Sequence, residues 1–177
     1  MSLTKKQNTK QEILSSAEVS QRVEVLRRFK TLLEQQRSKF QEYLQVLEAQ
    51  EASIINDEMD KIIQHAQLGQ AIISDISTIQ KVIDPLENMC RDFSTTTLSP
   101  SQAYSLSIKS EELETAQIKQ SLEKLKHTVL AQNQKNTEKL KVHMAGLRNQ
   151  ISRLKTLQKS RSPFSDQDSA SLIDVEA

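Results

Sequence analysis

Apolar residues return every three or four positions along two long stretches of the chain, one beginning after Ala17 and one after Asp57. This spacing places the apolar side chains on one face of an α-helix, where they pack against a partner helix. No alternation of period two is present, so a β-strand interpretation is disfavoured. The first series is Val19, Val23, Leu26, Phe29, Leu33, Phe40, Tyr43 or Leu44, Leu47 and Ile54, and the second is Met59, Ile62, Ala66, Gly69, Ile73, Ile76 and Ile83.

The polar break between the two series predicts a turn. Asn56 and Asp57 are both favourable N-cap residues, and the acidic side chains of Asp57, Glu58 and Asp60 suit the positive end of a new helix. With so few residues between the series, the two helices should fold back antiparallel. We therefore predict a helical hairpin over residues 17–93 that turns at Asn56-Asp57, after a flexible N-terminus at residues 1–16.

One helix-breaking signal lies within the second helix of the predicted hairpin. Asp84, Pro85 and Glu87 read as a cap, a first helical position and a capping-box glutamate, so the second helix should kink or restart there and end near Phe93. Gly69 either permits a close helix approach or is simply tolerated at a cost of about 1 kcal/mol. The side chains expected to pack inside the bundle are Leu26, Phe29, Leu33, Phe40 and Leu47.

A third helix is predicted after a linker. The linker covers residues 94–109 and contains the sequence STTTLSPSQ, and a long helix follows over residues 110–159. Its apolar series lapses across Gln132–Asn136, which we interpret as a hinge or a solvated stretch. The series runs Ile118, Leu122, Leu125, Val129 before the lapse and Leu140, Met144, Leu147, Ile151, Leu154 after it.

Residues 160–177 are predicted to form a flexible tail, because Ser162-Pro163 stops the helix and the following residues are polar. The tail contains a short apolar cluster, Leu172-Ile173-Asp174-Val175, which either docks on the body or has no role. The predicted fold is all-α: a long antiparallel helical hairpin plus a third long amphipathic helix, with coiled-coil-like packing.

Composition supports long helices with a thin core. The 177 residues include only 2 Gly and 3 Pro, aromatic residues make up 3%, and Trp is absent. No stretch of about 18 apolar residues exists, so no membrane insertion is expected. The N-terminus lacks the features of a secretory signal, and the single cysteine, Cys90, fits a reducing compartment. We expect a cytoplasmic protein.

Charge is unevenly distributed although the net charge is +1. Residues 42–92 carry ten acidic against three basic side chains, and residues 113–161 carry eleven Lys or Arg against three acidic side chains. A basic stretch of this length raises the possibility of nucleic-acid binding. No aromatic residues are interleaved to stack on bases, so we favour a basic helix that lies beside the acidic one or is solvated, with no nucleic-acid partner.

The side chains needed for catalysis are missing from the sequence pattern. His65, His127 and His143 each lack a second metal ligand at helical spacing, and Cys90 has only Arg91 as a basic neighbour. There is no glycine-rich phosphate loop and no Gly-x-Ser-x-Gly turn. We predict no catalytic residue, no metal site and no cofactor, and therefore a protein that is not an enzyme.

The third helix and tail resemble the C-terminal part of FlgN-type flagellar export chaperones. In that family a long helix carries two asparagines about three residues apart, here Asn133 and Asn136, followed by an amphipathic stretch, a flexible loop and a short tail such as 172–177. The loop usually contains a tyrosine and a glycine, which are absent here. The resemblance implies a cytosolic chaperone of bacterial flagellum biogenesis. It would keep hook-filament junction proteins soluble and deliver them to the type III protein export apparatus.

The surface for such a client is expected on the C-terminal half of the long helix. The spacing of four, three, four and three puts five side chains on one face, and we predict that they bind the client: Leu140, Met144, Leu147, Ile151 and Leu154. Alternatively, they complete an intramolecular bundle, in which case Leu147→Asp would bury an unpaired charge and destabilise the protein by several kcal/mol. A structural coiled-coil subunit or adaptor of a larger assembly is the alternative function.

Overall fold

The computed structural model describes residues 16–95 and 102–160 of the chain, and these residues contain three helices and no strand. Helix α1 is Ser16–Ile55, α2 is Met59–Thr95 and α3 is Gln102–Ser160. The all-α prediction is confirmed. The described chain divides within α3 into two units, one ending at Asn136 and one beginning at Thr137.

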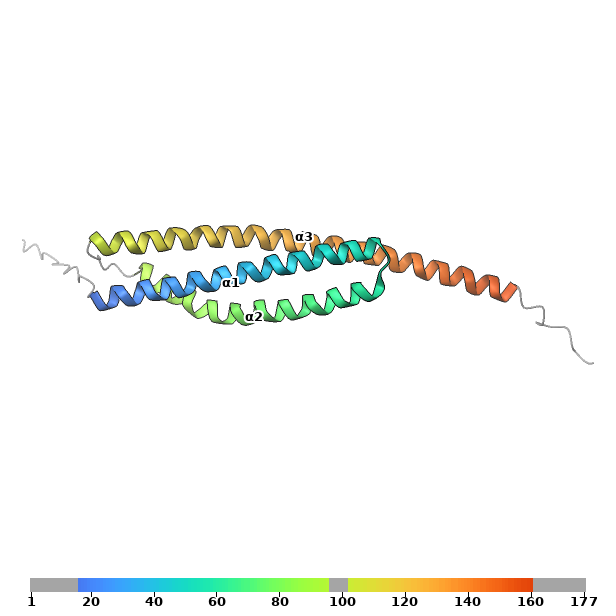
Figure 1. The fold of residues 1–177 in the computed structure, drawn as a ribbon, viewed down its shortest axis with the longest axis horizontal. Helices are drawn as coiled ribbons and strands as arrows, with labels where there is room; N and C mark the ends of the chain where they lie inside the picture. Colours follow the sequence, from blue (N-terminus) through green and yellow to red (C-terminus); the bar gives the residue numbers. More distant parts are fainter. Residues whose placement is uncertain (1–15, 96–101, 161–177) are drawn as a thin grey trace, which may run out of the picture. The chain divides into compact units, whose positions relative to one another are not determined.

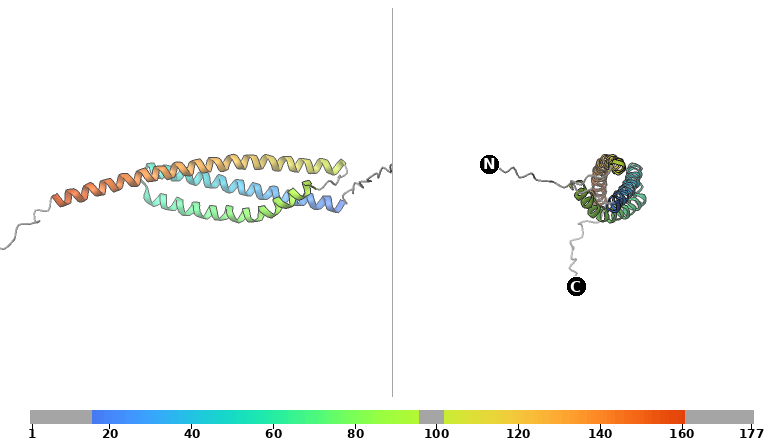
Figure 2. Two further views of the ribbon diagram at one scale, coloured as in Figure 1. Left: turned by 180° about the vertical axis from the view of Figure 1, so that it is seen from behind. Right: turned by 90° about the vertical axis from the view of Figure 1, so that its left-hand side faces the viewer.

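In the first unit, α1 and α2 form an antiparallel hairpin, and the N-terminal part of α3 lies along it (Figure 1). Seen from behind and end-on, the three helices of this unit pack around a common axis (Figure 2). Helix α1 contains neither Gly nor Pro and is rich in Leu, Gln and Glu. Such residues keep most of their rotamer freedom in a helix, which explains its 40-residue length without a break.

The turn between α1 and α2 confirms the predicted position of the hairpin but corrects its mechanism. Asp57 adopts a left-handed conformation, with φ of 59°. Its N–H lies 3.4 Å from the carbonyl oxygen of Ile54, and the Glu58 N–H donates to the carbonyl of Ser53 at 2.9 Å. This pair of bonds is a Schellman ending of α1, and Asp tolerates the left-handed region better than most side chains. Asp57 therefore terminates α1.

Glu58, not Asn56 or Asp57, occupies the N-cap position of α2. It directly precedes Met59, the first residue of the helix, and its carbonyl accepts the N–H of Ile62 at 3.1 Å. A carboxylate at this end is favoured by the positive pole of the helix dipole. The predicted acidic start of α2 is therefore present, shifted by one residue.

Helix α2 continues through Pro85 to Thr95 without restarting. Because Pro85 has no N–H, it cannot make the bond to the carbonyl four residues earlier, and such sites bend helices. The yellow-green C-terminal part of α2 turns toward α1 in Figure 1. Of the two expected outcomes at Pro85, a restart of the helix does not occur.

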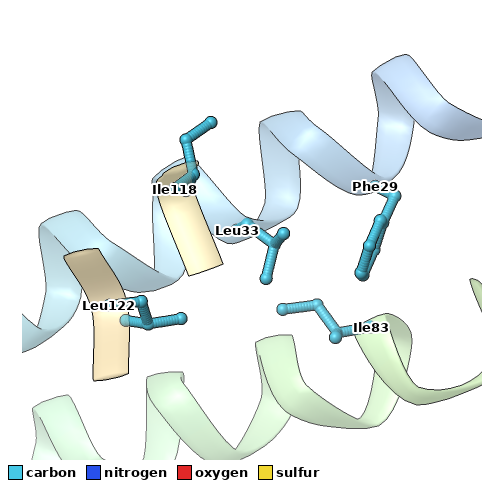
Figure 3. Close-up of a cluster of buried hydrophobic side chains, with 5 residues drawn as sticks. All are labelled: Phe29, Leu33, Ile83, Ile118 and Leu122. Carbon is cyan, nitrogen blue, oxygen red and sulfur yellow. The ribbon is translucent and has the colours of Figure 1, made fainter. Parts of the chain in front are cut away.

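The core is built by all three helices. Phe29 and Leu33 of α1 meet Ile83 of α2 and Ile118 and Leu122 of α3 (Figure 3). Of the side chains predicted to be internal, four are buried: Leu26, Phe29, Leu33 and Leu47. Phe40 is only half-buried at the edge of this cluster, with the ammonium of Lys126 lying 5.9 Å from the centre of its ring.

The apolar face of α2 differs from the predicted series. Ile72 is buried, whereas Ile73 is 40% exposed, and Met59 and Ala66 are exposed as well. A Cβ placed on Gly69 would lie 3.1 Å from the ring of Tyr43, so the missing side chain allows α1 and α2 to approach closely. With Gly69 facing α1, the spacing of the buried series continues through Ile72 rather than Ile73.

The predicted linker at residues 94–109 was too long at both ends. Helix α2 reaches Thr95 and α3 begins at Gln102, because no Gly or Pro interrupts the chain between Gln102 and Ala145. Ser16 and Ser160 are helical. The remainder of the predicted flexible N-terminus and of the predicted tail lies outside the described residues.

Candidate functional site

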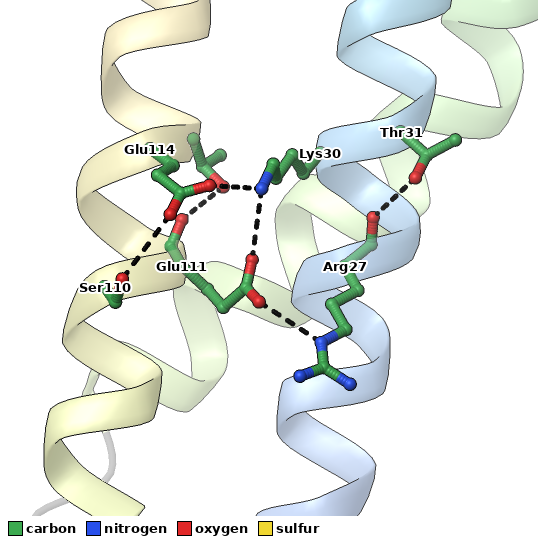
Figure 4. Close-up of polar contacts among 7 residues, drawn as sticks. Arg27, Lys30, Thr31, Ser110, Glu111 and Glu114 are labelled. Carbon is green, nitrogen blue, oxygen red and sulfur yellow. Dashed lines mark hydrogen bonds and ion pairs between the residues drawn. The ribbon is translucent and has the colours of Figure 1, made fainter.

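Charged pairs attach the start of α3 to α1. The carboxylate of Glu111 lies 3.2 Å from the Nε of Arg27 and 3.6 Å from the Nζ of Lys30, and Lys30 also pairs with Glu114 (Figure 4). The hydrogen bond from Lys30 holds the pKa of the Glu114 carboxyl below its usual range. The same bond raises the pKa of Lys30. Glu111 therefore bridges two basic side chains one turn apart and aligns α3 with α1.

A buried polar layer attaches α3 to α1 again near the turn of the hairpin. The amide of Asn136 is 1% exposed, and its Nδ2 donates to the carbonyl of Leu47 at 2.7 Å and to Gln50 at 3.1 Å. Its Oδ1 accepts a hydrogen bond from Gln132 at 3.1 Å, and Gln132 also donates to Glu51. The ammonium of Lys135 lies 2.9 Å from Glu51.

We expected the stretch Gln132–Asn136 to be a hinge or a solvated lapse, and it is not fully solvated, since Gln132 and Asn136 make hydrogen bonds to α1. It continues the packing face of α3 with polar side chains, because Gln132 and Asn136 follow Val129 at spacings of three and four. Two asparagines carry the resemblance to FlgN-type chaperones, and of these Asn136 is buried and Asn133 is exposed. Both the start and the end of this part of α3 are thus fixed to α1.

A second polar layer lies between α1 and α2. Gln36 is 2% exposed, and its side chain donates to Gln80 at 2.6 Å, which in turn donates to Asp84 at 2.6 Å. Closer to the turn, the hydroxyl of Ser53 lies 3.4 Å from Nδ1 of His65. The polar side chains of such a layer meet their hydrogen-bond partners in only one register of the two helices.

The five predicted client-binding residues belong to the second unit, on the part of α3 that begins at Thr137. We call Leu140, Met144, Leu147, Ile151 and Leu154 the apolar stripe. Leu140 and Leu147 are half-buried, whereas the exposed fractions of Met144, Ile151 and Leu154 are 48%, 52% and 65%. An apolar row with this exposure on one helix is the geometry that receives an amphipathic partner helix.

The flanks of the stripe are basic. Residues 137–160 carry six Lys or Arg and one acidic residue, Glu138. Lys141, Arg148 and Lys155 follow one another at intervals of seven, so they form one row beside the apolar stripe, and we call them the basic flank. In coiled coils such flanking positions choose partners by charge, so this surface favours an acidic amphipathic partner.

The groups that could carry chemistry are dispersed. No three His, Cys, Asp or Glu side chains within residues 16–95 and 102–160 come close enough to hold a metal ion. Cys90 lines a groove of about 320 Å³ with Phe29, Glu87 and Lys119, and burial raises the pKa of its thiol. A raised pKa lowers the thiolate fraction and with it the reactivity of the thiol. Across the described helices, none has the length and apolar character to cross a membrane.

Comparison with known proteins finds a relative in Treponema pallidum. An uncharacterized protein of Treponema pallidum (strain Nichols) is 31% identical to it over 162 residues, which cover 92% of this chain and 96% of the Treponema protein. The chain belongs to the family of this Treponema protein. The shared region of the Treponema family must include most of the three helices, since they make up the greater part of the chain. No family model matches the chain, and no solved structure matches it.

Proposed function

We propose that the protein is a cytoplasmic export chaperone of the FlgN type that holds a helical segment of its client on the apolar stripe. The proposed clients are hook-filament junction proteins, which the chaperone keeps soluble before export. The single observation that carries this proposal is the exposure of the stripe, with Ile151 and Leu154 each more than half exposed.

The first unit supports this proposal because it has a complete core of its own. Every buried residue of the described chain lies at or before Asn136, so the stripe contributes none of them. A client helix can therefore leave the stripe without removing a buried part of the bundle. Met144 within the stripe adds an unbranched side chain that adapts to different partner shapes.

A structural coiled-coil subunit is the second candidate function, and the exposed apolar side chains of α2 favour it. In a permanent assembly these residues would be covered by another chain. They include Ile63, Leu68, Ile73, Val82 and Met89. Sedimentation separates the two functions, since the chaperone should be a small species without client and the subunit should be obligately oligomeric.

The test is the loss of client binding on Ile151→Asp, with Val142→Asp as the matched control. Val142 is 74% exposed but lies about 200° around the helix from Leu140, outside the stripe. We expect Ile151→Asp to weaken binding of a labelled C-terminal peptide of a hook-filament junction protein roughly tenfold or more, because burying an Ile side chain is worth about 1.5–3 kcal/mol.

A substitution at the exposed Ile151 tests client binding with less effect on folding than one at Leu147, which is half-buried. Circular dichroism should show both aspartate variants folded, and Val142→Asp should bind the peptide normally. A folded Ile151→Asp variant that binds normally, or one that unfolds, would overturn the proposal.

A further inference from the structure

The apolar stripe and its basic flank require a partner that is apolar on one side and acidic beside it. A second copy of the same surface does not meet this requirement. Residues 137–160 carry a net charge of five positive units, from six basic and one acidic side chain, so two stripes face to face would repel each other.

The same chain carries a segment of the required chemistry directly after α3. Residues 161–177 contain four acidic side chains against one basic side chain, Arg161. The apolar residues Leu172, Ile173 and Val175 alternate there with Asp174 and Glu176. An apolar cluster flanked by carboxylates is complementary to an apolar stripe flanked by Lys and Arg.

The connection is long enough for this segment to reach the stripe. At 1.5 Å of rise per residue, Leu154 lies about 9 Å and Leu147 about 20 Å along the helix from Ser160. Residues 161–171 span at most about 40 Å when fully extended. Tethering over such a distance raises the local concentration of the segment to about the millimolar range, so even weak contacts are populated.

We propose that residues 172–176 dock on the apolar stripe of their own chain, with Leu172, Ile173 and Val175 on the apolar side chains and the carboxylates on the basic flank. The segment then acts as an intramolecular competitor that the client must displace. That competition rests on the proposed function, whereas the docking itself does not.

Tryptophan fluorescence tests the docking, because the chain has no Trp of its own. Leu154→Trp places a single reporter on the stripe, and Val142→Trp places the same reporter outside it. In the full chain we expect the emission of Leu154→Trp to lie at shorter wavelength than in the same variant carrying Asp174→Lys and Glu176→Lys. We also expect high salt to remove this difference, and the emission of Val142→Trp to stay unchanged throughout.

Identical emission of Leu154→Trp with and without the two charge reversals overturns the docking. A blue shift that grows with protein concentration overturns it too, because the segment would then come from another copy. Binding of the client peptide is measured separately on the unlabelled chain, where the charge reversals should strengthen it several-fold. A positive fluorescence result without any client binding would leave the docking in place and reject the proposed function.

Discussion

Single buried polar residues determine how the helices of the first unit align. The amide of Asn136 reaches across to the backbone of α1 at Leu47, which only one register of α3 permits. An apolar residue at this position would pack in neighbouring registers almost equally well, since apolar contacts are not directional. Asn136 therefore contributes specificity of alignment as well as stability.

Replacement of Asn136 by alanine tests this role. We expect Asn136→Ala to lower the free energy of unfolding by about 1–3 kcal/mol, because Gln50 and Gln132 lose a buried hydrogen-bond partner. Gln134→Ala is the matched control, since Gln134 is an exposed amide on the same turn of helix. Urea unfolding followed by circular dichroism measures both, and equal midpoints for the two variants would contradict a structural role for Asn136.

Acidification should loosen the ion pair between Lys30 and Glu114. The pKa of Glu114 is lowered in the folded protein from an ordinary value of 4.5, so its contribution to stability is complete above that pH. As the pH falls below 4.5, Glu114 takes up a proton in the unfolded chain before it does so in the folded protein. The stabilisation by this carboxylate therefore decreases until the pH reaches the pKa of Glu114 in the folded protein. Wild type should therefore lose more stability between pH 6 and pH 3 than Glu114→Gln.

Urea midpoints at pH 6 and pH 3 measure this difference. The control is Glu112→Gln, which removes an exposed carboxylate two residues away. It should follow the wild-type pH dependence. If Glu114→Gln follows it as well, the ion pair does not contribute to the acid sensitivity of the bundle.

The polar residues of the core are the part that sequence patterns could not supply. Periodicity assigns polar side chains to the solvent, so Gln132 and Asn136 were interpreted as a lapse, and Gln36 was left out of the first series. Their burial depends on partners distant in the chain, such as Gln80 for Gln36. Those partners become visible only once the helices are placed side by side.

At the scale of the helices, the apolar spacing predicted far more of the structure than it did for the buried polar side chains. The existence and order of the three helices and the position of the hairpin turn followed from spacing and from the scarcity of Gly and Pro, whereas the start of α3 was predicted too late in the chain. The error in α2 arose where two isoleucines are adjacent, because either Ile72 or Ile73 completes a spacing of three to four. The sequence does not reveal that the ring of Tyr43 lies close to Gly69, one turn before Ile72, where an added Cβ would be 3.1 Å from it.

The left-handed residue of the turn provides a test at this scale. We expect Asp57→Val to lower the free energy of unfolding by about 1–3 kcal/mol, because a β-branched side chain is strained at a φ of 59°. Asn56→Val introduces the same side chain one position earlier and is the control, with a smaller expected effect. Thermal unfolding compares the two variants, and an equal loss in both would show that the turn does not depend on the left-handed conformation.

At the scale of the whole molecule, the described chain combines a packed bundle with a helical segment that contributes no buried residue. Spacing predicted the apolar stripe, and the resemblance to FlgN-type chaperones supplied the expectation of a client; Met144, Ile151 and Leu154 of the stripe are exposed. The charge of its partner could be anticipated from Lys141, Arg148 and Lys155. The identity of that partner could not, because a stripe of apolar residues accepts many amphipathic helices.

Truncation tests this separation. Removing residues 145–177 should leave the free energy of unfolding of the bundle unchanged within about 0.5 kcal/mol, since no residue in that range is buried in the described helices. Removing residues 129–177 instead deletes Val129 and Asn136 and should destabilise the bundle by several kcal/mol. Urea unfolding of the two shortened chains measures the contrast, and a comparable loss in both would show that the last part of α3 stabilises the bundle.

The three-residue turn at Asn56, Asp57 and Glu58 also bears on how the chain is made. The contacts between α1 and α2 beside the turn close short loops, which favours their early formation in folding. During synthesis this hairpin emerges from the ribosome before the residues of α3 that complete the core. Until then Phe29, Leu33 and Ile83 lack the side chains of Ile118 and Leu122 that cover them in the finished bundle. The nascent hairpin is thus the stage of synthesis at which this protein itself most needs protection from aggregation.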